Sequence, residues 1–461
     1  KNQLKDKQDK KDLLATRLSC VDTSGLGISP LAGKTLVQYA GSLVGRDFRA
    51  IAQVAPFVLQ DLVSPECYET WKSLSRLIPL IWQPEISNIG LHLSLLTHAI
   101  QQFLLRTARW TASWFNKPKF HIIVHLPEHI RRFGPAILFA TEAFESFNAV
   151  IRAKSVHSNR QAPSRDIAKA FAQGNRIRHI MSGGMILGTG SCRMTDEAEG
   201  HNTTKKPPFS RNPKDWTSAG CRALNLCQVP WSPIRSYIGI KDDSSPTRLC
   251  NRDPQCKAPT AYSSLKSGTY LRDGCPPQSK FWTCLSCVLP RGDKCHVSNY
   301  VVARTKEGPV IGQVIEILQS ENTTTYAADA ILLRHYIPQE YPISSYDMPY
   351  LIPENAWSLL PPSDVLCTVN TQHPCMELKC SATGTAPLLL ERAASALTKQ
   401  IVVHKEPKEL RVLNTCQMRD ALILQPFRVP TTVLDVQQSL EHSATAAYTI
   451  RRGKTAGRGD A

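Results

Sequence analysis

The hydrophobic pattern of this 461-residue chain changes along its length, and that change restricts its fold more than any other feature. In the N-terminal part, apolar residues recur every three or four positions along a helix predicted from about Asn88 to Trp114. From about Phe281 onward, short runs rich in β-branched residues are bounded by turn residues, a pattern typical of strands. We therefore expect an α+β multidomain chain, with an N-terminal all-α bundle and a C-terminal small β-barrel or sandwich.

Composition shifts divide the chain into four predicted parts. Residues 1–186 form the helical part, and residues 187–280, rich in Ser, Thr, Pro, Lys and Asp, form a loop-rich linker. Residues 281–425 form the β-rich part, and residues 426–461 a basic tail. The predicted strands are Ser298–Ala303, Val310–Leu318, Ala330–His335, Asp364–Asn370 and Gln400–His404.

The charge balance favours a polyanionic partner. The chain has 55 Lys and Arg against 38 Asp and Glu, a formal net charge of +17. Basic side chains that neutralise phosphates release counterions and supply most sequence-independent affinity for DNA, although a basic surface can also be merely solvated. No apolar run approaches eighteen residues, so we expect no membrane span.

Three helices are predicted between Lys117 and Gly184. The run Phe120–Leu126 is strongly apolar and predicts a short buried helix that ends at Pro127. A second helix is expected to start near Thr141, with Glu145, Asn148 and Arg152 on one polar stripe, and a third is expected from Ser164 to about Met181. Between Arg131 and Ile180 there are nine Lys or Arg and three Asp or Glu, so this region is a candidate anion-binding surface.

Four motifs in this region carry a family resemblance. They are Lys-Pro-Lys-Phe-His at 117–121, Arg-Arg-Phe-Gly-Pro at 131–135, Ala-Thr-Glu-Ala-Phe-Glu-Ser-Phe-Asn at 140–148 and Asn-Arg-Gln-Ala-Pro-Ser-Arg-Asp at 159–166. Over roughly residues 18–184 the chain resembles the end of the catalytic domain of CACTA-type (En/Spm-like) fungal DNA transposases. The resemblance implies a ribonuclease-H-like core in which two Asp and one Glu hold two Mg²⁺ ions for DNA strand cleavage and transfer.

The resemblance makes Glu145 the last catalytic carboxylate and a Mg²⁺ ligand. The two Asp residues would lie upstream, and the chain begins too late to include them, so we expect a fragment that is inert alone, binds DNA without sequence specificity and acts in the nucleus. The predicted contacts to the DNA backbone are basic residues near the Glu145 helix: Arg131, Arg132, Arg152, Lys154, Arg160, Arg165, Arg176 and Arg178.

The β-rich part resembles, more loosely, a bromo-adjacent-homology (BAH) module. The resemblance rests on the order of four strands, among them Gly-Gln-Val-Ile-Glu-Ile-Leu at 312–318 and Arg-His-Tyr at 334–336. It implies chromatin as a partner. The alternative function is therefore a non-enzymatic chromatin- or DNA-binding protein that works through this module.

Two groups of Cys and His residues are candidate zinc sites. The 15 cysteines, an odd number, are expected to be reduced, and buried thiols are the alternative to metal ligands. His121, His125 and His129 follow one another at four-residue steps, and here we expect packed or hydrogen-bonded side chains in preference to zinc. The first candidate group is Cys284, Cys287, Cys295 and His296, and the second is Cys367, His373, Cys375 and Cys380, with His404 as a substitute.

Overall fold

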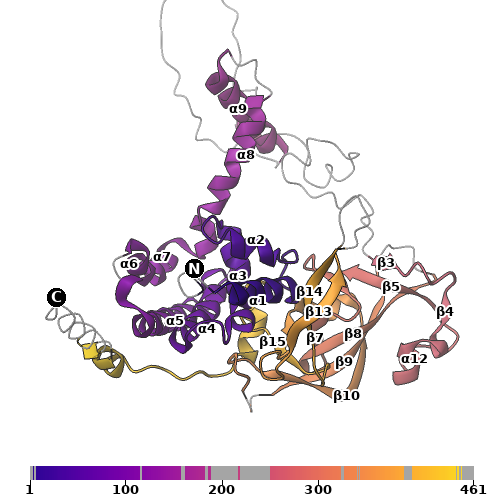
Figure 1. The fold of residues 1–461 in the computed structure, drawn as a ribbon. Coiled ribbons are helices and arrows are strands. Elements are labelled where there is room, and N and C mark those ends of the chain that lie inside the picture. Colours follow the sequence, from indigo (N-terminus) through magenta and orange to yellow (C-terminus); the bar gives the residue numbers. More distant parts are fainter. Residues whose placement is uncertain are drawn as a thin grey trace, which may run out of the picture. The chain divides into compact units, whose positions relative to one another are not determined.

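The structure, a computed structural model, describes residues 4, 7–114, 117–156, 161–181, 185–187, 216–218, 250–322, 327–339, 341, 343–388, 397–442, 444–445 and 448. The side chains of residues 112, 142–147, 149, 178, 180–181, 185–187 and 216–218 lie outside the described part. By contact, residues 1–139 and 249–461 form one compact unit and residues 140–248 another. The chain combines an N-terminal helical region with a C-terminal curled antiparallel sheet, so the expected α+β class is confirmed (Figure 1).

Two long amphipathic helices of the helical region, α4 and α5, begin at clear capping residues. Ser64 caps α4 by accepting a hydrogen bond from the Cys67 amide, and Asn88 caps α5 by accepting one from the Leu91 amide. Four residues of the predicted stripe on α5, Leu93, Leu96, Ile100 and Phe103, are buried and pack against Leu77 and Leu80 of α4, whereas Ile89 at the start of the helix is 46% exposed. The helices are α1 (Gln8–Cys20), α2 (Gly33–Gln38), α3 (Gly45–Leu59), α4 (Pro65–Ile81), α5 (Ile89–Trp110), α6 (Pro118–Ile122) and α7 (Leu126–Phe133).

The segment around α6 differs from the expected buried helix. Phe120, Ile123 and Leu126 pack against the core, but Ile122 is 56% exposed and Val124 is 52% exposed. Pro127 does not end a helix. It lies in the first turn of α7, where a missing amide hydrogen costs nothing because first-turn amides have no acceptor within the helix.

The main sheet of the first unit is antiparallel and contains four of the five predicted strands. The fifth, predicted at 400–404, belongs to a separate hairpin. The central order of the main sheet is β11-β7-β8-β9-β10-β15-β12. The first half of β8 pairs with β7 and its end pairs with β5, while β9 runs along its other edge. The strands are β3 (Cys250–Arg252), β4 (Thr260–Ala261), β5 (Lys280–Val288), β6 (Lys294–His296), β7 (Tyr300–Thr305), β8 (Gly308–Ser320), β9 (Ala330–Gln339), β10 (Tyr350–Leu360), β11 (Val365–Val369), β12 (Thr371–Gln372) and β15 (Arg411–Leu413).

The β-rich part begins at Cys250, before the predicted boundary at 281. Strands β3 and β4 pair with β5, and helix α12 (Lys266–Tyr270) follows them. The Ser267 amide and hydroxyl donate hydrogen bonds to Glu316 of β8, which fixes α12 on the sheet. Strands β13 (Ser381–Pro387) and β14 (Thr398–Val403) form the separate hairpin, and in Figure 1 helix α1 lies beside it.

The second unit contains the two helices predicted after Thr141. Helix α8 spans Glu142–Val156 and α9 spans Pro163–Met181, and the two pack against each other. The short strands β1 (Met185–Leu187) and β2 (Trp216–Ser218) pair antiparallel.

Candidate metal centre

Four metal-ligating side chains meet where the main sheet joins the β13–β14 hairpin. His373 follows β12, Cys375 and Cys380 lie in the turn before β13, and His404 directly follows β14. Their ligand atoms all lie within 4.8 Å of one another. Among the described residues, these four form the one group of three or more His, Cys, Asp or Glu side chains whose ligand atoms lie close enough together to hold a metal ion. We call these four residues the metal centre.

Local backbone structure explains why the four residues converge. The segment between the two cysteines closes on itself, because the Cys380 amide donates to the Cys375 carbonyl at 2.8 Å and Lys379 adopts a left-handed φ of 52°. Pairing of Ser381 with Val403 across the hairpin then brings the residue before β13 next to the residue after β14. Cys380 and His404 are therefore neighbours although they are far apart in sequence.

Three of the distances between ligand atoms in the metal centre match a tetrahedral zinc ion. Zinc lies about 2.3 Å from sulfur and about 2.0–2.1 Å from nitrogen, so neighbouring ligand atoms are separated by about 3.3–3.8 Å. The Cys375 sulfur lies 3.5 Å from His373 Nδ1 and 3.3 Å from His404 Nδ1. The Cys380 sulfur lies 3.6 Å from His373 Nδ1. Two thiolates and two imidazoles are also a usual ligand set of structural zinc.

Outer contacts orient these ligands. His373 Nε2 lies 3.1 Å from the Lys405 carbonyl oxygen, so its N–H donates there and leaves Nδ1 free for a metal. The Lys405 amide donates to the Cys380 sulfur at 3.3 Å, and such a contact stabilises a thiolate. In the same turn, the Glu377 carboxylate accepts hydrogen bonds from the Ser345 amide and hydroxyl and from the Tyr350 hydroxyl.

Burial favours the neutral forms of His373, Cys375 and His404. It lowers the pKa of His373 to about 4, with further contributions from His404 and Arg411, and it lowers the pKa of His404. Burial, together with the neighbouring Cys380, raises the pKa of Cys375 to about 12. Neutral imidazoles are the ligand form of histidine, and a bound divalent ion would displace the thiol protons.

A cavity of about 100 Å³ adjoins the metal centre. Helix α1 contributes Arg17 and Cys20 to its lining, and β15 contributes Arg411. The Cys20 sulfur accepts a hydrogen bond from the Val402 amide of β14 at 3.4 Å. This proximity could not be predicted from the sequence, because Cys20 lies about 350 residues before the centre and shares no motif with it.

Only part of the second predicted zinc group belongs to the centre. His373, Cys375 and Cys380 do, and His404 is the fourth ligand. Cys367 is fully buried in β11, within a hydrophobic core cluster. Cys367 shares this cluster with Val369, two residues further along the strand, so it faces the core and not the metal centre.

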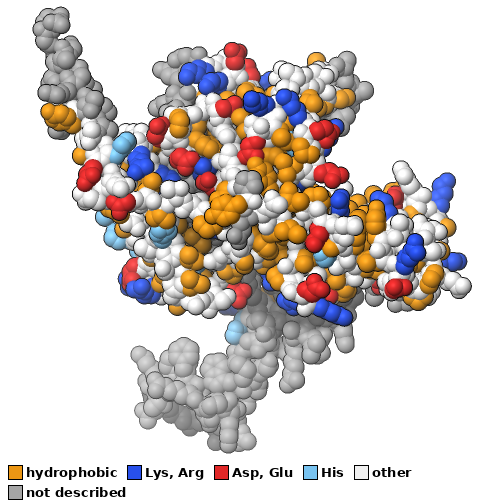
Figure 2. Space-filling view, turned by 90° about the horizontal axis from the view of Figure 1, so that it is seen from below, with side chains coloured by type: hydrophobic (Ala, Val, Ile, Leu, Met, Phe, Trp, Pro, Cys, Tyr) orange, Lys and Arg blue, Asp and Glu red, His pale blue; other side chains and the backbone are white. Residues whose placement is uncertain are grey.

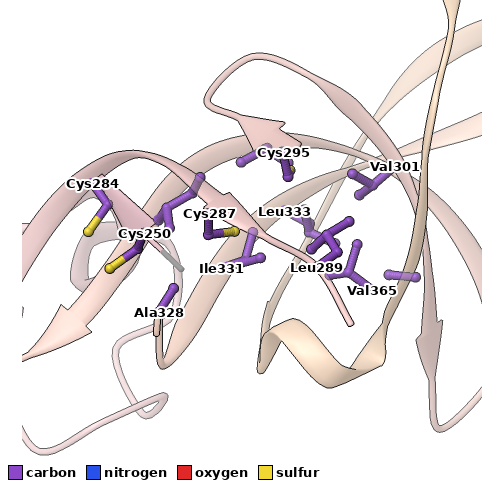
Figure 3. Close-up of a cluster of buried hydrophobic side chains, with 13 residues drawn as sticks. Cys250, Cys284, Cys287, Leu289, Cys295, Val301, Ala328, Ile331, Leu333 and Val365 are labelled. Atoms are coloured by element: carbon purple, nitrogen blue, oxygen red, sulfur yellow. The ribbon is translucent and has the colours of Figure 1, made fainter. Parts of the chain in front are cut away.

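The first predicted group does not converge. Cys284, Cys287 and Cys295 are buried with Cys250 among Ile and Leu side chains, whereas His296 is exposed. Because successive residues of a strand point to opposite faces, Cys295 and His296 of β6 cannot both face one ion. In Figure 3 the Cys250 and Cys284 sulfurs lie side by side, while the Cys287 sulfur points away from them. These cysteines act as small hydrophobic core residues.

The predicted DNA-contacting residues fall in both units. Arg131 and Arg132 of α7 are exposed, and Arg131 pairs with Glu128 at 3.2 Å. On α8 and α9, Arg152, Arg165 and Arg176 are exposed and Lys154 is half-buried. Glu145 lies in α8 and Arg178 in α9, but their side chains lie outside the described part, as does Arg160 altogether.

Comparison with known proteins gives one match. Residues 246–431 match the model of a domain of unknown function, DUF8590, and this range contains the whole metal centre. No curated protein matches the chain, and no solved structure does. Among the described helices, none is both long enough and apolar enough to cross a membrane.

Proposed function

We propose that the chain binds one zinc ion at the metal centre and that the ion is structural. The observation that carries this proposal is the convergence of four protein ligands within 4.8 Å. Catalytic zinc sites keep a coordination position for water or substrate, whereas four protein ligands complete the tetrahedron. The ion would therefore join the end of β12, the Cys375–Cys380 turn and the base of the hairpin, and it would take no part in a reaction.

Metal analysis of the purified 461-residue chain tests this proposal. We expect one equivalent of zinc, and we expect Cys375→Ser and His404→Ala each to weaken zinc binding by at least about 100-fold, because even outer-shell changes cost about 10- to 100-fold. Cys20→Ser is the matched control, since Cys20 lines the same cavity but is not a ligand, and it should keep full affinity. Zinc-free protein after purification and reconstitution, or equal losses in Cys20→Ser, would reject the site.

We also propose that the α8–α9 pair binds DNA without sequence specificity. The described side chains of these helices include five basic residues, Arg152, Lys154, Arg165, Lys169 and Arg176, against the single acidic Asp166. By contrast, Lys and Arg are interspersed with Asp and Glu on the face seen in Figure 2. A local excess of one sign is what attracts a phosphate backbone.

DNA binding measured against salt concentration tests the second proposal. Changing Arg152, Arg165 and Arg176 to Gln together should reduce the slope of log affinity against log salt by up to about 3, roughly one for each lost phosphate contact. The control changes three exposed lysines of the first unit, Lys257, Lys266 and Lys306, to Gln. Equal effects of the two triple variants would mean that only net charge matters.

The transposase relationship remains a proposal that rests on the sequence resemblance. It assigns residues 18–184 to the end of a ribonuclease-H-like domain, Glu145 to the last Mg²⁺-binding carboxylate of that domain, and the function to DNA transposition in the nucleus. We expect the purified chain with Mg²⁺ not to cleave DNA, since one carboxylate cannot hold two ions. Cleavage that is abolished by Glu145→Ala would overturn this expectation of an inert chain.

The alternative function is chromatin binding through the BAH-like module. It predicts binding to nucleosomes that does not depend on the basic residues of α8 and α9.

A further inference from the structure

Two histidines lie close together on the surface of the helical region, apart from the metal centre. His121 of α6 and His125 of the following 3-10 turn (Ile123–His125) are both exposed, and their Nε2 atoms lie 3.2 Å apart. The two rings meet edge to face, at an interplanar angle of 78°. Two imidazole nitrogens therefore converge on one point at the solvent boundary.

The backbone that carries this pair is anchored on the core. Phe120, Ile123 and Leu126 all pack against the hydrophobic cluster of α4, α5 and α7. Phe120 also lies against the Phe103 ring at 5.9 Å and the Trp114 ring at 5.7 Å. The inward side chains thus fix the segment in a position that turns His121 and His125 outward, so the pair is preorganised.

We propose that His121 and His125 together bind a divalent transition-metal ion such as Ni²⁺, Cu²⁺ or Zn²⁺. Nitrogen ligands about 2.0–2.1 Å from such an ion lie about 2.8–3.0 Å apart in octahedral geometry and about 3.3–3.4 Å apart in tetrahedral geometry, and the observed 3.2 Å lies between these values. Imidazole suits these metals, and affinity rises from Co²⁺ through Ni²⁺ to Cu²⁺. With two protein ligands, the other positions stay open to water or to a donor from a second molecule.

The competing explanation is a plain hydrogen bond between the two rings, in which one Nε2–H donates to the other Nε2. This explanation needs no ion and predicts no chelation. A metal site formed by one surface histidine is a further alternative. The proposed chelate differs from it because binding requires both the His121 ring and the His125 ring. His129 provides the comparison, since it is exposed nearby on α7 and contacts Phe133 through its ring.

Calorimetric titration of the full chain with NiCl₂ tests the proposal, after one equivalent of zinc has been supplied for the metal centre. We expect one Ni²⁺ to bind, and we expect His121→Ala and His125→Ala each to weaken that binding by about tenfold or more. His129→Ala should bind as the unchanged protein does. All these positions are on the surface, and circular dichroism would check that each variant is folded.

Two results would overturn the proposal: unchanged Ni²⁺ affinity in both His121→Ala and His125→Ala, or an equal loss in His129→Ala. A double variant, Cys375→Ser with His404→Ala, separates this site from the metal centre. In that background the Ni²⁺ binding that depends on His121 should persist, whether or not the metal centre binds zinc.

Discussion

At the scale of single residues, buried amides join the helical region to the sheet. Asn370 and Asn414 are fully buried. The Asn370 side chain donates to the carbonyls of Asp22 and Ser24 at 2.8 Å, and the Asn414 side chain donates to that of Gln53 at 3.0 Å. Each backbone carbonyl would be costly to bury without a donor.

Replacing Asn370 by Ala should lower the free energy of unfolding by about 1–3 kcal/mol, because the Ser24 carbonyl loses its donor while the Asp22 carbonyl keeps only the Gln372 side chain. Urea denaturation of the full chain measures this change. Asn322→Ala, at an exposed turn, should stay within about 0.5 kcal/mol of the unchanged protein. A neutral Asn370→Ala would show that the amide contributes no net stability.

At the scale of elements, the β13–β14 hairpin shows where the sequence was informative and where it was not. The β-branched run at 400–404 predicted β14, but β13, Ser-Ala-Thr-Gly-Thr-Ala-Pro, has no large apolar side chain and was missed. One position has a packing reason: a Cβ at Gly384 would lie 2.6 Å from Val403 Cγ2 across the hairpin. The partner strand therefore requires glycine at this position, which no local sequence pattern reveals.

Removing zinc should loosen the hairpin and helix α1 together, since α1 packs on the hairpin next to the metal centre. Amide hydrogen exchange with and without a chelator measures this directly. We expect exchange in β13, β14 and α1 to become about tenfold faster or more, which corresponds to about 1.4 kcal/mol of local stability. Strands β7, β8 and β9 should change little. Uniform acceleration throughout the sheet would mean that the ion supports the whole unit instead.

At the scale of the whole molecule, the sequence predicted the segment types better than their association. The helical and strand periods predicted the α+β class. The Cys and His spacing predicted His373, Cys375 and Cys380 of the metal centre and named His404 as a substitute ligand, but it wrongly included Cys367. The docking of helices on the sheet depends on contacts such as Asn370 with Asp22, 348 positions apart, which periodicity cannot encode. Residues 246–431 match DUF8590, but Asn370 and Asn414 in this range bond to Asp22 and Gln53 outside it. The β-rich part therefore packs on helices that the matching range does not include.

The first unit is discontinuous in sequence, so two separate chains, residues 1–139 and 249–461, should associate when they are co-expressed. Gly25→Val should abolish their co-purification, because Gly25 has a φ of +80° and an added Cβ would lie 2.6 Å from the Val369 carbonyl carbon. Affinity purification through a tag on either chain reads out the association. Failure of the unchanged pair to associate, with zinc present, would contradict the docking described above.

The most direct test of the structural zinc centre is X-ray absorption at the zinc edge of the purified chain. The account predicts a first shell of two sulfur atoms at about 2.3 Å and two nitrogen atoms at about 2.0–2.1 Å. This shell should disappear in Cys375→Ser. A shell of four sulfur atoms, or one containing only oxygen and nitrogen, would contradict the proposed centre.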